Sequence, residues 1–204
     1  KPDRRQRQMC IRDRSRYDIT SFAGVSAHND IHNIFFEQDG TRFFAVTTNS
    51  EVLSFSLSTA FDISTATFIA ELDLTTDQTA VAFNNDGTKL YQLIVTANQP
   101  KVNTFSMTIP YDIANATLSD ALDLSETELV TINSNSKFGE DIHFNDTGSA
   151  MYILMEDRTN RLQSYIWQFS LDKRFDVSTA KIRGKWNVAL PNAGGYGYGL
   201  PKGI

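Results

Sequence analysis

The chain has 204 residues, of which 41% are hydrophobic and 21% charged, with a net charge of -5 at pH 7. This composition is that of a folded protein rather than a disordered one, and no run approaches the roughly 18–20 apolar residues that a membrane-spanning helix needs. Six basic and two acidic side chains fall in residues 1–14, which leaves 13 basic against 22 acidic for the rest. Such an acidic body excludes nucleic acid as a partner, because nucleic-acid binding needs a basic surface. The single cysteine, Cys10, excludes a disulfide framework or a cysteine-based zinc site within one chain.

The first 14 residues stand apart from the rest of the sequence. Residues 4–14 read Arg-Arg-Gln-Arg-Gln-Met-Cys-Ile-Arg-Asp-Arg, a string that resembles the conceptual translation of a transposon-based sequencing adapter. The alternatives are a basic nucleic-acid arm and a transit peptide. The resemblance implies a metagenomic reading frame, so we expect a non-native segment at 1–14, a repeat region at 15–204, and a longer native chain.

Two short sequences alternate along the remainder. The first, which we call the glycine marker, is Phe-x-x-(Asp/Thr)-Gly. The second, the aromatic marker, is (Phe/Tyr)-Asp-(Ile/Val)-x-x-Ala. Glycine markers end at Gly40, Gly87 and Gly148. Aromatic markers start at Phe61, Tyr111 and Phe175, with a degraded copy at Tyr17. The glycine markers follow one another after 47 and 61 residues, and such recurrence is the sequence signature of a repeat architecture.

In chain order, residues 15–26 read as the end of an interrupted repeat. The first complete unit, 28–74, opens with an apolar segment that ends at Asp39-Gly40. Asp-Gly between apolar runs predicts a hairpin, because glycine takes a positive φ at little cost. Leu53, Phe55 and Leu57 alternate with two serines, the pattern of a half-buried strand. We expect strands in this unit at 31–36, 42–47, 51–57 and 66–74, with the aromatic marker as a longer connection.

The second and third units, 79–124 and 139–186, repeat this order. We expect strands at 79–83, 89–96, 102–108 and 116–124, and again at 141–144, 150–154, 162–169 and 181–186. A polar insertion at 125–139 separates the two units, and such insertions often map to a binding face. No segment keeps a period of 3.6 residues, so we expect almost no helix.

Four strands per repeat of about 45–50 residues predict the blade of a β-propeller. The markers also resemble the repeat Phe-x-x-Asp-Gly-Thr-Lys-x-Tyr followed by Leu-Ser-Thr-x-Phe-Asp-Ile of bacterial and phage-associated propeller proteins; the matching stretches are 83–91 and 57–63. In the third unit Thr147, Ser149 and Ala150 depart from this pattern. We therefore predict an all-β, partial β-propeller of about three four-stranded antiparallel blades in an open arc. A β-sandwich or β-solenoid is the alternative.

Residues that recur in every unit are expected to build blades rather than to do chemistry. Asp62, Asp112 and Asp176 follow the marker aromatics, and their short carboxylates are suited to accept nearby backbone N–H groups. The marker aromatics themselves are expected to pack between blades. The three histidines are not at equivalent positions, no Gly-x-Ser-x-Gly motif is present, and we predict no metal site, no catalytic residue and no cofactor.

If the chain has a binding site, propeller geometry places it near the axis, on the loops that enter each first strand. The candidate binding residues are Asp30, His32, Asp77, Glu140 and Asp141. This acidic set is suited to a cation or a polyol. The alternative is that these side chains form only a solvated rim.

Two functions remain open at this point. The resemblance implies a non-catalytic binding or scaffolding module, extracellular or virion-associated, whose partner is a protein or carbohydrate surface together with the remaining blades of a longer chain. The alternative is a propeller enzyme of lactonase- or glycoside-active type with an axial acidic site.

Overall fold

The computed structural model describes residues 31–47, 50–74, 79–96, 99–124, 137–157 and 163–188. Residues 1–30, which include the adapter-like segment and Cys10, and most of the 125–139 insertion lie outside these ranges. The described residues form twelve strands in three separate four-stranded antiparallel sheets. No described helix is long and apolar enough to cross a membrane.

Each sheet takes four consecutive strands in chain order, and we call the sheets blades 1, 2 and 3. Blade 1 comprises β1 (Ile31–Phe36), β2 (Arg42–Thr47), β3 (Glu51–Leu57) and β4 (Ala66–Asp73). Blade 2 comprises β5 (Thr79–Phe83), β6 (Lys89–Thr96), β7 (Gln99–Ser106) and β8 (Thr117–Asp123). Blade 3 comprises β9 (Lys137–Phe144), β10 (Ala150–Asp157), β11 (Gln163–Leu171) and β12 (Ala180–Asn187).

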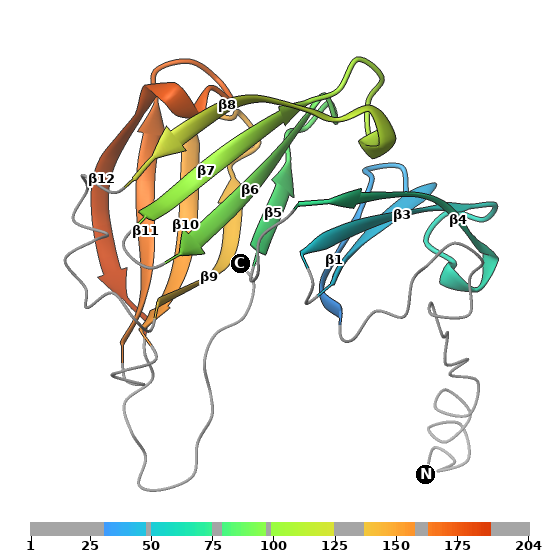
Figure 1. The fold of residues 1–204 in the computed structure, drawn as a ribbon, viewed down its shortest axis with the longest axis horizontal. Helices are drawn as coiled ribbons and strands as arrows, with labels where there is room; N and C mark the ends of the chain where they lie inside the picture. The colour runs from blue at the N-terminus through green and yellow to red at the C-terminus, as the bar shows by residue number, and fades with distance from the viewer. Residues whose placement is uncertain are drawn as a thin grey trace, which may run out of the picture.

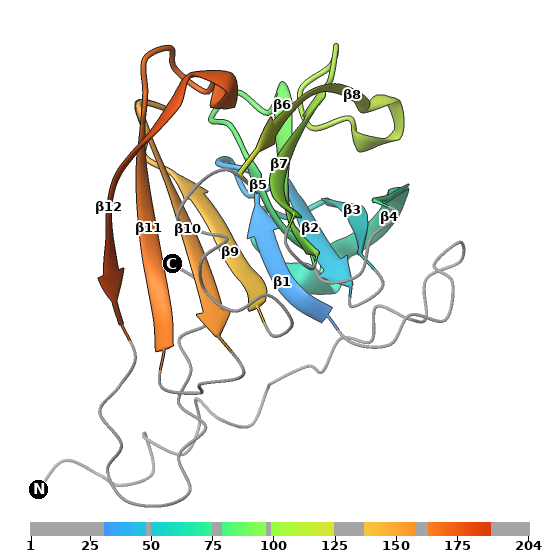
Figure 2. The same ribbon diagram turned by 60° about the vertical axis from the view of Figure 1, so that its left-hand side comes forward.

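The blades fan out as an open arc, with the last strands β4, β8 and β12 at the periphery (Figure 1). The first strands β1, β5 and β9 lie toward the inside of the arc (Figure 2). Three separate sheets in this arrangement exclude the β-sandwich alternative, which needs two sheets face to face. The predicted partial propeller of three antiparallel blades is confirmed.

Hydrophobic cores lie between neighbouring blades. Phe44 and Val46 of β2 pack with Val81 and Leu90 of blade 2. The opposite face of blade 2 packs in the same way against blade 3, where Trp167 is fully buried. Blade 2 thus buries one face on blade 1 and the other on blade 3, and the arc is held by contacts between successive repeats.

The strands agree closely with those expected, except that β10 ends at Asp157 rather than at 154 and that β7 and β9 start earlier. β7 starts at Gln99 rather than at residue 102, and β9 starts at Lys137 rather than at 141. Both added stretches are polar or contain proline, so hydrophobic alternation could not mark them. Backbone pairing extends the strands nevertheless, as the pairs Thr96↔Gln99 and Asp157↔Lys137 show.

The two markers of each repeat meet in space. Each marker aromatic has a positive φ, and its backbone N–H donates to the carbonyl of the marker glycine at 2.8–2.9 Å. The ring then lies directly over the glycine, where a Cβ would approach the ring atoms to under 3.0 Å. The three pairs are Gly40 with Phe61, Gly87 with Tyr111 and Gly148 with Phe175. Only glycine suits this position, because it tolerates both the positive φ and the close approach of the ring.

The prediction that the marker aromatics pack between blades is confirmed for two of the three rings. Tyr111 and Phe175 do contact the core shared with the preceding blade. Phe61 is 61% exposed, and its closest ring contact outside its glycine is Phe36 of the same blade. The shared role of the three rings is therefore to cover the glycine of their own blade.

The carboxylates that follow the aromatics serve the predicted structural role. Each aromatic marker ends in a single 3₁₀ turn, which the sequence did not predict. Asp62 and Asp176 accept the backbone N–H groups of Ser64 and Ser178 and so cap these turns. Asp112 makes no such cap bond and instead accepts a bond from the Asn115 side chain.

Aspartates also close the glycine-marker turns. Asp39 and Asp86 each accept the backbone N–H and the hydroxyl of the threonine two residues further on. Blade 3 departs from the repeat here, yet Thr147 and Ser149 share a hydroxyl–hydroxyl bond of 2.7 Å. The sequence departure in the third unit is thus compensated locally.

We expect stability to decline in acid because these carboxylates are hydrogen-bonded in the folded state. Hydrogen bonds lower the pKa of four aspartates, Asp39, Asp62, Asp86 and Asp176, below the ordinary value of 3.8. The main donor is the backbone N–H of Thr41 for Asp39, and a serine or threonine hydroxyl for the other three. A carboxyl group whose pKa is lower in the folded state stabilises the fold fully at pH values above its unfolded-state pKa. This stabilisation is lost as the pH falls through its folded-state pKa. The urea concentration at the midpoint of unfolding, measured from about pH 6 down to about pH 2.5, should therefore fall mainly below about pH 4. A variant with asparagine at all four positions should show a flatter profile, and an equally steep one would contradict this origin.

A basic side chain links each of the first two blades to the next. Arg42 Nη1 donates to the carbonyl of Tyr111 at 2.7 Å, and Lys89 Nζ donates to the carbonyl of Phe175 at 3.1 Å. The hydroxyl of Tyr91 donates to the same Phe175 carbonyl at 2.7 Å. In blade 3 the position of Arg42 and Lys89 is occupied by Ala150.

Candidate functional site

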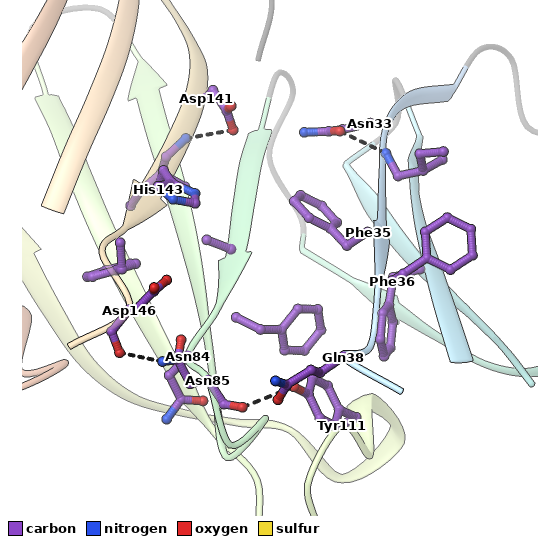
Figure 3. A pocket seen from close by; sticks show the side chains of 16 residues that line it. Asn33, Phe35, Phe36, Gln38, Asn84, Asn85, Tyr111, Asp141, His143 and Asp146 are labelled. Carbon is purple, nitrogen blue, oxygen red and sulfur yellow. Dashed lines mark hydrogen bonds between the residues drawn. The ribbon is translucent and has the colours of Figure 1, made fainter. Parts of the chain in front are cut away.

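A cavity of about 750 Å³ opens on the inner side of the arc. Residues of β1, β5 and β9, together with the turns that follow them, form its lining (Figure 3). The marker residue Tyr111 and Phe44 of β2 complete one end. The volume falls within the range of small-molecule binding sites in proteins.

One wall of the cavity is aromatic. Phe44 and Phe83 lie 4.6 Å apart between ring centroids, and Tyr111 lies 5.4 Å from Phe83 and 6.0 Å from Phe44. Phe35 of β1 adds a further ring to this wall (Figure 3). These rings are held by the core between blades 1 and 2, so the wall is a rigid part of the scaffold.

The opposite wall is polar and comes from blade 3. Asp141 and His143 lie two residues apart on β9, and period-2 alternation puts both on one face of the strand. Asp146 follows in the turn after β9. Asp141 is buried, and its Oδ1 accepts the backbone N–H of Ile142 at 2.9 Å. His143 and Asp146 are exposed to the cavity side (Figure 3).

Asn85 connects the two walls at the turn end. Its Nδ2 donates to the backbone carbonyl of Asp146, and its own carbonyl accepts the Tyr111 hydroxyl at 3.4 Å. Burial, followed by the nearby carboxylates of Glu37, Asp86 and Asp39, raises the pKa of Tyr111. The Tyr111 hydroxyl therefore stays protonated at neutral pH and acts as a hydrogen-bond donor.

The predicted site residues are only partly placed. Asp30 and Asp77 lie outside the described residues. His32 and Glu140 belong to β1 and β9, but their side chains also lie outside the described part of the structure. Asp141 lines the cavity from β9, in agreement with the strand expected at 141–144. The convergence of the five predicted residues therefore remains a prediction.

Sequence reasoning missed most of the polar lining. These residues are Asn33, Gln38, Asn84, Asn85, His143 and Asp146. A usable signal was present: His143 takes the place of Phe35 and Ala82 in the other two repeats. Positions that depart from the repeat in the first strand are the ones that can build a single site in a repeating structure.

Metal binding receives no support from the described side chains. Within the six described ranges, no group of three or more His, Cys, Asp or Glu side chains could hold a metal ion. What this arrangement can do is offer a flat apolar wall on one side and hydrogen-bonding groups on the other.

The fold and the inner cavity define a partial β-propeller, and solved structures agree with it. The chain is similar to the periplasmic gluconolactonase of Pseudomonas aeruginosa, with a TM-score of 0.50 and 14% identity over 78% of this chain and 41% of that one. It is also similar to a protein from Lactobacillus plantarum, with a TM-score of 0.51 and 11% identity over 77% of this chain and 41% of that one.

A third similar structure is the β-propeller domain of Cps50 (Swd1) from Myceliophteria thermophila, with a TM-score of 0.45 and 13% identity over 78% of this chain and 43% of that one. The chain thus spans about two-fifths of the length of the structures it matches. Identities this low indicate a shared fold only. No protein-family model and no curated protein sequence matches the chain.

Proposed function

We propose that this chain is a non-catalytic binding module of the propeller class that holds a ligand in the cavity on the inner side of the arc. The observation that carries this proposal is that the repeated residues and the cavity-lining residues have different roles. Repeated residues close turns, cap turns or cover glycines, whereas the polar groups that line the cavity differ from blade to blade. A site built from non-equivalent residues on an otherwise regular scaffold is the arrangement expected for specific binding.

A neutral hydroxylated ring, such as a mono- or disaccharide, suits the chemistry of the two walls. The aromatic wall of Phe35, Phe83 and Tyr111 offers apolar surface to the C–H face of a sugar. Asp146 and His143 on the other wall can accept hydrogen bonds from hydroxyl groups. The repeat resemblance adds the proposal that the module acts outside the cell or on a virion, with further blades of a longer chain beside it.

Binding of neutral saccharides, measured by saturation-transfer NMR and calorimetry, tests this proposal. We expect His143→Ala and Asp146→Asn each to weaken binding by about tenfold, the value of one hydrogen bond. Asp172→Asn is the matched control, because Asp172 is a surface carboxylate paired with Lys181 and does not line the cavity. Equal binding by all three variants, or no saccharide bound at all, would reject the proposed ligand class.

The alternative function is a propeller enzyme of lactonase- or glycoside-active type. It is favoured by one observation: Asp141 and His143 share one face of β9 and both line the cavity, so the imidazole could act there as a general base. The test is hydrolysis of gluconolactone and of aryl glycosides, followed with the wild type and His143→Ala. Turnover that disappears in His143→Ala would establish the enzyme and displace the binding module.

A further inference from the structure

Two carboxyl groups line the cavity, and both stand where the other blades have uncharged residues. Asp146 occupies the second variable position of the glycine marker, where the other two blades have the amides Gln38 and Asn85. Asp141 occupies a position of the first strand that is an asparagine in blade 1 and an alanine in blade 2. Because the same turn forms with an amide at the position of Asp146, the fold does not require its negative charge.

The cavity lining offers no fixed positive charge to balance these groups. Among the described residues that line the cavity, none is a lysine or an arginine. Arg42 donates to the Tyr111 carbonyl, and its Nε lies 3.9 Å from the Glu37 carboxylate. Lys89 donates to the Phe175 carbonyl. These two cations are thus engaged in the contacts between blades, and the lining itself carries negative charge.

The aromatic wall lies in the same negative field. Burial, followed by three nearby carboxylates, raises the pKa of Tyr111. These carboxylates belong to Glu37, Asp86 and Asp39. A field that opposes a negative charge on the Tyr111 oxygen favours a positive charge beside the ring, and the faces of aromatic rings attract cations themselves.

We propose that the hydroxylated ring held in this cavity carries an ammonium group, as an amino sugar does, and that the ammonium lies between the Asp146 carboxylate and the aromatic wall. This inference rests on the proposed function and narrows the ligand class of the same site. A carboxylate accepts a charge-assisted hydrogen bond from an N–H donor. A metal ion is a poorer fit, because within the described ranges no three His, Cys, Asp or Glu side chains could hold one.

One asparagine connects the carboxylate side of the cavity with its aromatic side. Asn85 Nδ2 donates to the backbone carbonyl of Asp146, and the backbone carbonyl of Asn85 accepts the Tyr111 hydroxyl at 3.4 Å (Figure 3). Asp146 and Tyr111 therefore lie on either side of a single residue, so that a substituent of a ring stacked on the wall can reach the carboxylate. The bond from Asn85 uses the backbone of Asp146, so a change of the Asp146 side chain leaves it in place.

Calorimetric titration with D-glucosamine, N-acetyl-D-glucosamine and D-glucose at neutral pH tests the inference. The three sugars differ at one carbon, which carries an ammonium, a neutral amide or a hydroxyl group. We expect D-glucosamine to bind about three- to tenfold more tightly than D-glucose, the combined effect of a cation–π contact and an exposed charge pair. This preference should shrink between about 20 mM and about 500 mM NaCl, because salt screens charges. N-acetyl-D-glucosamine should bind no more tightly than D-glucose.

Three variants show which side chains set the ratio of the D-glucosamine affinity to the D-glucose affinity. Asp146→Asn removes the charge and keeps the shape, so the ratio should fall toward one. Phe35→Leu keeps an apolar surface on the wall without an aromatic face, so the ratio should fall by about twofold. Asp172→Asn is the control and should keep the wild-type ratio, because Asp172 pairs with Lys181 on the surface and does not line the cavity.

The outcomes separate this inference from the proposed function on which it rests. Equal affinities for D-glucosamine and D-glucose, or an unchanged ratio in Asp146→Asn, would overturn the ammonium group and leave the neutral ring as the ligand. Binding of D-glucosamine alone would support the ammonium group and correct the neutral ligand class. If none of the three sugars bound, both the inference and the proposed ligand class would be rejected.

Discussion

Replacing Gly87 with alanine is expected to lower the free energy of unfolding by about 2–5 kcal/mol, from the left-handed backbone of an L-residue and from overpacking against a partly buried aromatic ring. Gly87 has a φ of +68°, and a Cβ there would overlap the Tyr111 ring. Relief by moving the ring would disturb two further contacts of Tyr111, its ring contact with Phe83 and the bond from Arg42 to its carbonyl. Urea unfolding followed by tryptophan fluorescence measures the change.

Gly184 provides the matched control for this substitution. It lies in β12 without a positive φ, and a Cβ would meet only the far end of the exposed Trp186 ring, at 3.3 Å. Gly184→Ala should therefore change stability by no more than about 0.5 kcal/mol. The double variant Gly87→Ala/Tyr111→Ala should cost less than the sum of its two single changes, since removing the ring removes the overlap. A Gly87→Ala variant as stable as the wild type would show that a Cβ is tolerated beneath the Tyr111 ring and would contradict this explanation.

The blades were predictable because their signals are local. Alternation at residues 51–57 and an Asp-Gly turn after 31–36 act within a few residues of the chain, and the recurrence of both fixes the number of units. The contact of Gly87 with Tyr111 was not predictable in this way. Gly87 and Tyr111 are 24 residues apart, and neither marker contains a sequence signal that predicts the contact of the ring with the glycine.

The candidate site was harder to predict than the fold for a physical reason. A cavity between three first strands depends on how the blades fan, which short-range patterns do not encode. Asp141 was expected at the point where a loop enters the 141–144 strand; the structure extends β9 back to Lys137, so Asp141 lies inside the strand, paired with Leu154 of β10. His143 was visible as a departure from the repeat, but only the geometry places it opposite an aromatic wall.

Buried polar contacts between blades were the feature that the sequence predicted least well. Gln92 lies within the apolar run of β6 and reads as an ordinary member of that strand. In the structure it is fully buried between blades 1 and 2. Its Nε2 donates to the Leu74 carbonyl of blade 1 at 3.2 Å, and its Oε1 accepts from Asn103 Nδ2 at 3.0 Å. The corresponding residues in the other blades are Ala45 and Ile153, which cannot make these bonds. We call the two hydrogen bonds of the Gln92 side chain the polar tie, and it occurs only between blades 1 and 2 of the described blades.

Gln92→Leu is expected to lower the free energy of unfolding by about 1–3 kcal/mol, because a buried donor and a buried acceptor lose a partner at once. Gln92→Ala should cost about 2–4 kcal/mol, since it adds a cavity to the same loss. The measurement is urea unfolding of both variants, with Gln168→Leu as the matched control. Gln168 is half-buried, and within the described part of the chain its side chain makes one hydrogen bond, of 3.4 Å to the Tyr152 hydroxyl, so its loss should cost less than about 1 kcal/mol.

A double-mutant cycle distinguishes the polar tie from simple packing. If the Gln92–Asn103 bond carries the effect, Gln92→Leu/Asn103→Leu should be more stable than the sum of the single losses predicts, because neither variant residue leaves a buried amide without its partner. Packing alone would make the two losses additive. Hydrogen exchange should then show the loss in β2, β4 and β6, the strands that meet at this interface, while β10 and β11 keep their protection, since repeat proteins open interface by interface. Uniform loss of protection across the three blades would mean that the arc unfolds as one unit and that Gln92 stabilises all of it.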